Sequence, residues 1–144
     1  MKQWTETCRG VVYPWHCDHL GHMNVQHYVG FFDIGAFHFL SVLGFGSHNM
    51  HDIGATFVDA QHTVRYINEQ PPGSLIKVES AVTKIGNKSA TVLHRMTNTE
   101  TDLVAATSEI TLVYFDLKAR TSMAIPDDLR ARMQPYLVDA SELG

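Results

Sequence analysis

The apolar residues of this chain follow a helical pattern near the N-terminus and an alternating pattern from residue 56 onward. Between residues 25 and 43 they recur every three or four positions, as on one face of an α-helix. Asn24 precedes this segment and is a favourable N-cap residue, while Gly44 follows it and is a frequent helix terminator. The pattern therefore predicts a helix over residues 25–43.

The opposite side of this predicted helix is also rich in apolar residues. The side chains there include Phe31, Ile34, Phe37 and Val42. A helix that is apolar on most sides is usually buried. Gly30 and Gly35 lower its intrinsic propensity by roughly 1 kcal/mol each, so we expect other parts of the chain to approach closely there. We therefore expect the rest of the protein to wrap this helix.

Alternation of apolar and polar residues predicts β-strands elsewhere in the chain. The predicted strands cover residues 5–13, 56–66, 75–85, 89–97 and 103–115. In residues 56–66 the even-numbered positions are the more apolar, so they are predicted to face inward throughout. Short turns such as Pro71-Pro72-Gly73 and Gly86-Asn87 separate the later strands and indicate antiparallel neighbours.

The remaining segments complete an α+β domain that spans residues 1–144. Residues 45–54 are predicted to form a loop, and residues 126–133 a short helix that is capped near Asp127. A helix apolar all round and a sheet with one apolar face are buried together when the sheet curls around the helix. The outer face and edges of such a sheet, and the rest of the helix, can be covered by a second copy.

Composition and charge exclude several classes of protein. The net charge is −4 with no basic block, which argues against nucleic acid as the main partner. No run approaches the ~20 apolar residues that cross a membrane, and the first residues lack the apolar stretch of a signal peptide. Two cysteines, Cys8 and Cys17, are too few for a disulfide scaffold. We therefore expect a cytoplasmic protein with free thiols that binds no membrane.

A polar octet immediately before the predicted helix carries the candidate chemistry. It reads Cys17-Asp18-His19-Leu20-Gly21-His22-Met23-Asn24, and Tyr28 and the run Phe31-Phe32-Asp33 follow it. This resembles the motif Asp-x-x-Gly-His-Met/Val-Asn, then Tyr, then an aromatic-acidic pair, of acyl-CoA thioesterases of the 4-hydroxybenzoyl-CoA thioesterase type. Val64-x-Tyr66 and the turn at residues 71–73 look like this family too.

The resemblance implies a hot-dog fold, in which a curved antiparallel five-stranded sheet wraps one long central helix. It implies hydrolysis of an acyl-CoA to a free acid and coenzyme A without a cofactor. The catalytic carboxylate of the family falls on Asp18, and its oxyanion donor falls on the backbone amide of Val25. Members of the family are homodimers or homotetramers with each site at a subunit boundary. The chain departs from many relatives at Val25, where they have Asn, and at Ser74, where they have Asp.

The residue types suit thioester hydrolysis. A helix N-terminus offers unpaired N–H groups and partial positive charge to the carbonyl oxygen. The carboxylate of Asp18 can act on water as a general base or attack the thioester directly. We expect four residues to bind the substrate or shape its site. Gly21 lets the loop turn back, His22 orients Asp18 or bonds the substrate, Asn24 caps the helix, and Tyr28 packs beside them.

Two other functions fit parts of the pattern. One is an enoyl-thioester hydratase of the same fold, although the loop lacks the Asn-Pro spacing expected there. The other is a non-catalytic acyl-CoA-binding protein, against which the position of Asp18 argues, because binding alone needs no carboxylate beside the thioester.

Other side chains allow further interpretations of the site. A metal interpretation rests on His16, His19 and His22, and Cys17 is a second possible nucleophile. No second Cys/His pair with structural-zinc spacing completes a metal site, so no metal is expected. The basic residues near the Gly86-Asn87 hairpin either meet the phosphates of coenzyme A or are simply solvated; they are Lys84, Lys88 and Arg95.

Overall fold

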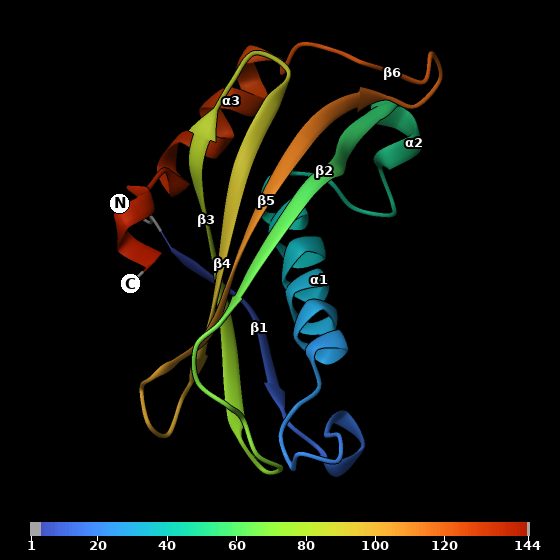
Figure 1. Cartoon of the computed structure of the whole chain (residues 1–144). Helices are drawn as coiled ribbons and strands as arrows, with labels where there is room; N and C mark the ends of the chain where they lie inside the picture. Colours follow the sequence, from blue (N-terminus) through green and yellow to red (C-terminus); the bar gives the residue numbers. More distant parts are fainter. Residues whose placement is uncertain (1–3, 144) are drawn as a thin grey trace.

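The computed structural model describes residues 4–143 and contains a curled antiparallel sheet with few helices (Figure 1). The strand order is β1-β3-β4-β5-β2, and a short β6 lies beside β5. The strands are β1 (Thr5–Val11), β2 (Ala55–Tyr66), β3 (Leu75–Ile85), β4 (Ser89–Asn98), β5 (Val104–Asp116) and β6 (Thr121–Ser122). The helices are α1 (Val25–Val42), α2 (Met50–Ile53) and α3 (Asp127–Met133), with 3₁₀ turns at Pro14–His16, Gln134–Tyr136 and Ala140–Leu143.

The elements predicted from periodicity are confirmed, with ends that differ by two residues or fewer. The short helix α2 is the exception, because it lies inside the segment that the sequence predicts as a loop. Its single turn ends at Gly54, which has the left-handed backbone conformation (φ 73°) that favours glycine. Four residues are too short to show a helical period, so the sequence gives no sign of α2.

The predicted inward face of β2 is wrong for the first half of the strand. The pairing with β5 shifts between Asp59 and Gln61, which is a β-bulge. An extra residue at a bulge reverses the alternation of side chains beyond it. Consequently Phe57 is buried, whereas Val58, on the predicted inward face, is 36% exposed. The bulge also puts Asp59 and His62, three residues apart, on the same side of the strand.

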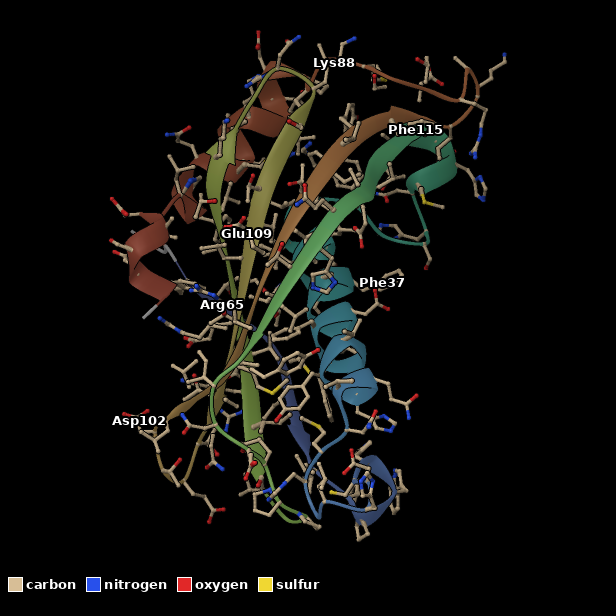
Figure 2. The ribbon with its side chains drawn as sticks, viewed as in Figure 1. Phe37, Arg65, Lys88, Asp102, Glu109 and Phe115 are labelled. Atoms are coloured by element: carbon tan, nitrogen blue, oxygen red, sulfur yellow. The ribbon has the colours of Figure 1, made fainter. Side chains whose placement is uncertain are left out.

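Helix α1 lies against the concave face of the sheet, which covers only one of its sides (Figure 1). The residues buried by this contact are Tyr28, Phe32, Gly35 and Phe39. The other side carries exposed apolar residues, namely Val25, Val29, Ile34, Phe37 and Val42. Phe37 is 68% exposed and points away from the sheet (Figure 2). The expectation that this helix is buried on most sides is therefore not met within a single chain.

The two glycines of α1 have different surroundings. A Cβ at Gly35 would lie 3.0 Å from Thr7 Oγ1 and 3.1 Å from Val78 Cγ1, so the close approach expected there exists. A Cβ at Gly30 would meet nothing within 4 Å. Position 35 therefore has little room for a methyl group, whereas position 30 has open space.

We expect Gly35→Ala to destabilise the fold and Gly30→Ala to stabilise it by up to about 1 kcal/mol, because alanine favours helices and only Gly30 has room for it. Urea unfolding of the two variants measures both effects. A Gly30→Ala variant less stable than wild type would contradict the assignment of open space at that position.

The C-terminal segment bonds to the part of β3 that β1 does not cover. The backbone N–H of Val138 donates to the carbonyl of Val82 at 2.7 Å, beyond the part of β3 that pairs with β1. Leu129 and Met133 of α3 join the core beneath the end of α1, and Val138 packs with Leu93 on the other face. In residues 4–143, no helix has the length and apolar character needed to cross a membrane.

Candidate active site

The octet forms a tight loop that returns the chain to the start of α1. Gly21 has a left-handed φ of 81°, which glycine adopts without strain. The Gly21 N–H donates to the Asp18 carbonyl at 3.0 Å, and the Asp18 N–H donates to the His22 carbonyl at 3.2 Å. Cys17 and Met23 then pair as an isolated β-bridge. Gly21 therefore has the position expected for it, because the turn brings Asp18 back toward the helix.

Asn24 joins Asp18 to the first turn of α1. Its Oδ1 accepts from the Gln26 N–H at 3.1 Å, which is the predicted cap, and its Nδ2 donates to Asp18 Oδ2 at 2.8 Å. The Leu20 N–H donates to Asp18 Oδ1 at 2.9 Å. The Asn24 amide, and next the Leu20 N–H, lower the pKa of Asp18 because both donate to its charged form. The second function of Asn24, as a donor to Asp18, was not predicted from the sequence.

The backbone amide of Val25 is available at the same place. Val25 is the first residue of α1, so its N–H has no acceptor inside the helix. Among the residues that the structure describes, no other group accepts from it. Free N–H groups and the helix dipole make this end of α1 attractive to a developing negative charge.

A cleft of about 370 Å³ brings the expected site residues together. Its lining includes Asp18, His22, Val25 and Tyr28, all of which the sequence singled out. Gly21 and Asn24, which were also expected at the site, are not part of this lining. The cleft is completed by Leu20, Met23, Tyr66, Ile67, Asn68 and Glu69. Tyr66 is the last residue of β2, and the next three residues come directly after it. Of these four, only Tyr66 had a sequence signal, in the Val64-x-Tyr66 spacing.

His22 and Tyr28 each have a partner from the segment at the end of β2. His22 Nε2 lies 3.0 Å from Glu69 Oε2 and makes no hydrogen bond with Asp18, so it does not orient the carboxylate directly. The rings of Tyr28 and Tyr66 meet edge to face with centroids 5.1 Å apart. Burial raises the pKa of Tyr28, which keeps its hydroxyl protonated as a hydrogen-bond donor. Glu69 is therefore a site residue that sequence reasoning missed, and Tyr66 is one that the sequence marked only through its family spacing.

The structure also places the side chains of the phosphate-binding and metal-binding interpretations. Arg95 is engaged on the outer face, where it stacks on Trp4 at 4.1 Å and bonds Glu79 at 3.2 Å, so it is not free for a phosphate. His16 Nδ1 accepts from the Tyr13 N–H at 2.9 Å. In residues 4–143, no three His, Cys, Asp or Glu side chains are grouped as metal ligands would be.

The arrangement therefore provides an ionised carboxylate and a free helix-terminal amide in one cleft. These are the two groups that an acyl transfer reaction needs, one to activate a nucleophile and one to stabilise an oxyanion. Among the described residues, Lys and Arg are absent from the lining, so the cleft keeps the negative character that Asp18 and Glu69 give it.

Comparison with known families and structures identifies the family of the chain and supports the fold. The profile described as thioesterase-like superfamily matches residues 12–133. The chain therefore belongs to the thioesterase-like superfamily, a group of thioester hydrolases. A comparison with curated proteins found no significant match.

Solved structures of thioesterases share the fold. The hypothetical protein SAV2348 from Staphylococcus aureus, solved in complex with CoA, is 18% identical with a TM-score of 0.84, over 94% of this chain and 85% of that one. YbaW, a probable thioesterase from Escherichia coli, is 22% identical with a TM-score of 0.78, over 94% and 99%. Slr0204, a 1,4-dihydroxy-2-naphthoyl-CoA thioesterase from Synechocystis, is 13% identical with a TM-score of 0.75, over 88% and 93%.

Proposed function

We propose that this chain hydrolyses an acyl-CoA thioester to a carboxylic acid and coenzyme A. The observation that carries the proposal is the position of Asp18. Its carboxylate is kept ionised by two donors and shares a cleft with the free N–H of Val25. The relative from Staphylococcus aureus that binds CoA and the relatives named as CoA thioesterases support coenzyme A as the thiol.

The reaction divides between these two groups. The thioester oxygen accepts from the Val25 N–H, and negative charge collects there as the carbonyl carbon becomes tetrahedral. In the general-base route, Asp18 takes a proton from water while the water oxygen bonds to the carbonyl carbon. The carbon–sulfur bond then breaks, and the proton passes from Asp18 to the departing thiolate. In the alternative route, Asp18 itself bonds to the carbonyl carbon and the carbon–sulfur bond breaks, which releases coenzyme A as its thiolate. Water then cleaves the resulting anhydride to the free acid and the Asp18 carboxylate, and the proton released goes to the thiolate.

A panel assay tests the proposed function. Thiol release is followed with acyl-CoA substrates that differ in chain length, branching and aromatic character. Release of free coenzyme A with at least one of them supports hydrolysis. Tight binding of the thioesters without any release would instead identify a binding protein.

We also propose that two copies pair through the free edge of β2 and the exposed side of α1. β2 is a twelve-residue strand that pairs with β5 only, so one row of its backbone groups is open to another strand. A hollow of about 660 Å³ lies between α1 and the first half of β2. Antiparallel pairing would set this hollow beside the partner's Asp18 cleft, because Phe57 and Tyr66 lie toward opposite ends of β2. The second copy would also complete the wrapping of α1 as a central helix.

Phe37→Asp is expected to weaken this association, because it places a charge at the most exposed large apolar side chain of α1. Sedimentation measures the result, with Asp52→Asn on α2 as a conservative surface control. A Phe37→Asp variant that keeps the wild-type mass in solution would exclude this face from the interface.

Asn24 gives a separate prediction for the pH dependence of hydrolysis. Asn24→Ser keeps a capping side chain but removes the donor to Asp18. The pKa of Asp18 should then rise, because the lowering effect of that donor is lost. The acid limb of kcat/KM should move to higher pH, since Asp18 must be ionised to react. An unchanged acid limb would show that another group controls it.

A further inference from the structure

A row of polar side chains crosses the whole sheet beneath α1. Its members come from all five long strands in spatial order: Thr7 on β1, Ser80 on β3, His94 on β4, Ser108 on β5 and His62 on β2. His94 lies under α1, with its ring centroid 6.2 Å from that of Phe32. The row separates the two apolar clusters of the core.

The hydrogen bond from Thr7 to the Val78 carbonyl gives the inner end of the row a direction, and this direction assigns the tautomer of His94. The hydroxyl of Thr7 donates to the Val78 carbonyl at 3.3 Å, so its oxygen is free to accept from Ser80 at 2.7 Å. The Ser80 oxygen then accepts from His94 Nδ1 at 2.6 Å. His94 therefore carries its hydrogen on Nδ1, and its Nε2 is a bare acceptor.

This acceptor is buried and unsatisfied. Among the described residues, His94 Nε2 is a buried side-chain atom without a hydrogen-bond partner. Burial, and next the nearby His62, lower the pKa of His94 to about 3, so the ring is neutral and cannot turn this atom into a charged donor. A buried acceptor without a partner is rare in native proteins and needs an explanation.

Ser108 supplies the explanation, because it stands between two imidazole acceptors and has one hydrogen to donate. It is the cross-strand neighbour of His94 and lies 2.6 Å from His62 Nε2. If His62 Nε2 carries a hydrogen and donates it to Ser108, the Ser108 hydroxyl is free to turn to His94 Nε2. Because the Thr7 hydrogen is given to the Val78 carbonyl, this direction is the one that leaves no buried polar atom of the row unsatisfied.

The outer end of the row lies on β2 between the Asp18 cleft and the second hollow, and His62 is part of neither lining. His62 is exposed, whereas Ser108 behind it is 1% exposed. On the same face of β2, Tyr66 lines the Asp18 cleft four residues after His62, and Asp59 lines the second hollow three residues before it. At about 3.3 Å per residue, His62 lies roughly 10 to 13 Å from each. Its Nδ1 has no partner in the part of the chain that the structure describes.

We propose that the buried row holds His62 with its hydrogen on Nε2, and that the bare Nδ1 accepts a hydrogen bond from the bound thioester. This inference rests on the proposed function for the identity of the ligand. The donor is either an amide N–H of the pantetheine arm or a hydroxyl of the acyl group. His62 is then a substrate-binding residue, and Ser108 and His94 are positioning residues that act through it.

Nitrogen-15 NMR of the imidazoles tests the tautomers without any need for activity. At a pH where histidines are neutral, wild type should show His62 protonated on Nε2 and His94 protonated on Nδ1. In Ser108→Ala, His62 should change to a mixture of tautomers, because its fixed acceptor is gone. A wild-type His62 with its hydrogen on Nδ1 would overturn the proposal.

Calorimetric binding of a thioether analogue of acyl-CoA tests the ligand contact without hydrolysis. His62→Phe should raise the Kd about tenfold, the effect of losing one hydrogen bond. His62→Gln, whose side-chain oxygen can accept, should recover part of the affinity, and Ser108→Ala should lose part of it. Thr107→Ser, on the opposite face of the same strand, should bind as wild type does. An unchanged Kd in His62→Phe would overturn the contact even if the tautomers are as expected.

Two analogues that differ only by an acyl hydroxyl identify the donor. An equal loss of affinity for both in His62→Phe assigns the contact to the pantetheine amide, and a loss confined to the hydroxylated analogue assigns it to the acyl group. Failure of the wild type to hydrolyse any thioester would refute the proposed function. The Kd of the thioether analogue and the imidazole tautomers measured by NMR would still decide whether His62 binds the ligand.

Discussion

Asp18→Asn is expected to lower kcat for acyl-CoA hydrolysis by about 10³-fold, within the usual range for loss of a general base. The carboxamide has nearly the same shape but can neither take a proton from water nor attack a thioester. Its oxygen still accepts from the Leu20 N–H, but its NH₂ group replaces the oxygen that accepts from Asn24 Nδ2, so the loop is expected to lose that one hydrogen bond. Stopped-flow detection of released thiol measures the rate, and circular dichroism checks the fold.

Two controls separate chemistry from binding. The Kd of a thioether analogue should change little in Asp18→Asn, because the loss falls on the reaction rather than on the ligand. Glu69→Gln changes another carboxylate of the same cleft and should retain most activity. Full activity of Asp18→Asn together with loss in Glu69→Gln would instead assign the base to the pair of Glu69 and His22, which lie 3.0 Å apart.

Local patterns predicted the strands and the main helix because each has a clear period. The strands β2 to β5 alternate with period two over ten or more residues each, and α1 keeps apolar residues at helical spacing between a strong cap and a glycine. The octet predicted the loop residues of the site because its members are adjacent in sequence. Asp18, Gly21 and Asn24 need only one tight turn to come together.

The remaining features depend on contacts between distant segments. The bulge of β2 inserts one residue, so the alternation looked continuous while the inward face changed at Asp59. Glu69 and Ile67 reach the cleft only because the end of β2 lies beside the Asp18 loop. No local sequence pattern in either segment indicates that the two lie close together in the fold.

The polar row had a weak signal that periodicity alone could not interpret. Ser80 lies on the apolar face of its strand with Ile76 and Val78, and His94 lies on that of the next strand with Val92. A polar residue at an inward position is unremarkable in one strand. Only the strand register shows that these residues form one row, because it places Ser80, His94 and Ser108 side by side on three strands.

The second large expected effect is a decrease in the free energy of unfolding in mild acid, caused by His94. In the folded state burial lowers the pKa of His94 to about 3, against 6.5 for a free histidine. Between these values the unfolded chain binds one more proton than the folded chain. The free energy of unfolding should therefore be highest above pH ~6.5 and fall by about 1.4 kcal/mol per pH unit toward pH ~3 from this residue alone.

Urea unfolding between pH 6.5 and 5 isolates this contribution, because most carboxylates remain ionised there. His16, whose pKa is lowered by partial burial and by His27, adds a smaller slope of the same sign. His94→Gln cannot titrate and should lose about 1.4 kcal/mol per pH unit of the slope, whereas His19→Gln in the exposed loop should keep it. Equal slopes in wild type and His94→Gln would mean that His94 gains a proton in the folded protein, and the sheet beneath α1 would then have to admit water or a counter-charge.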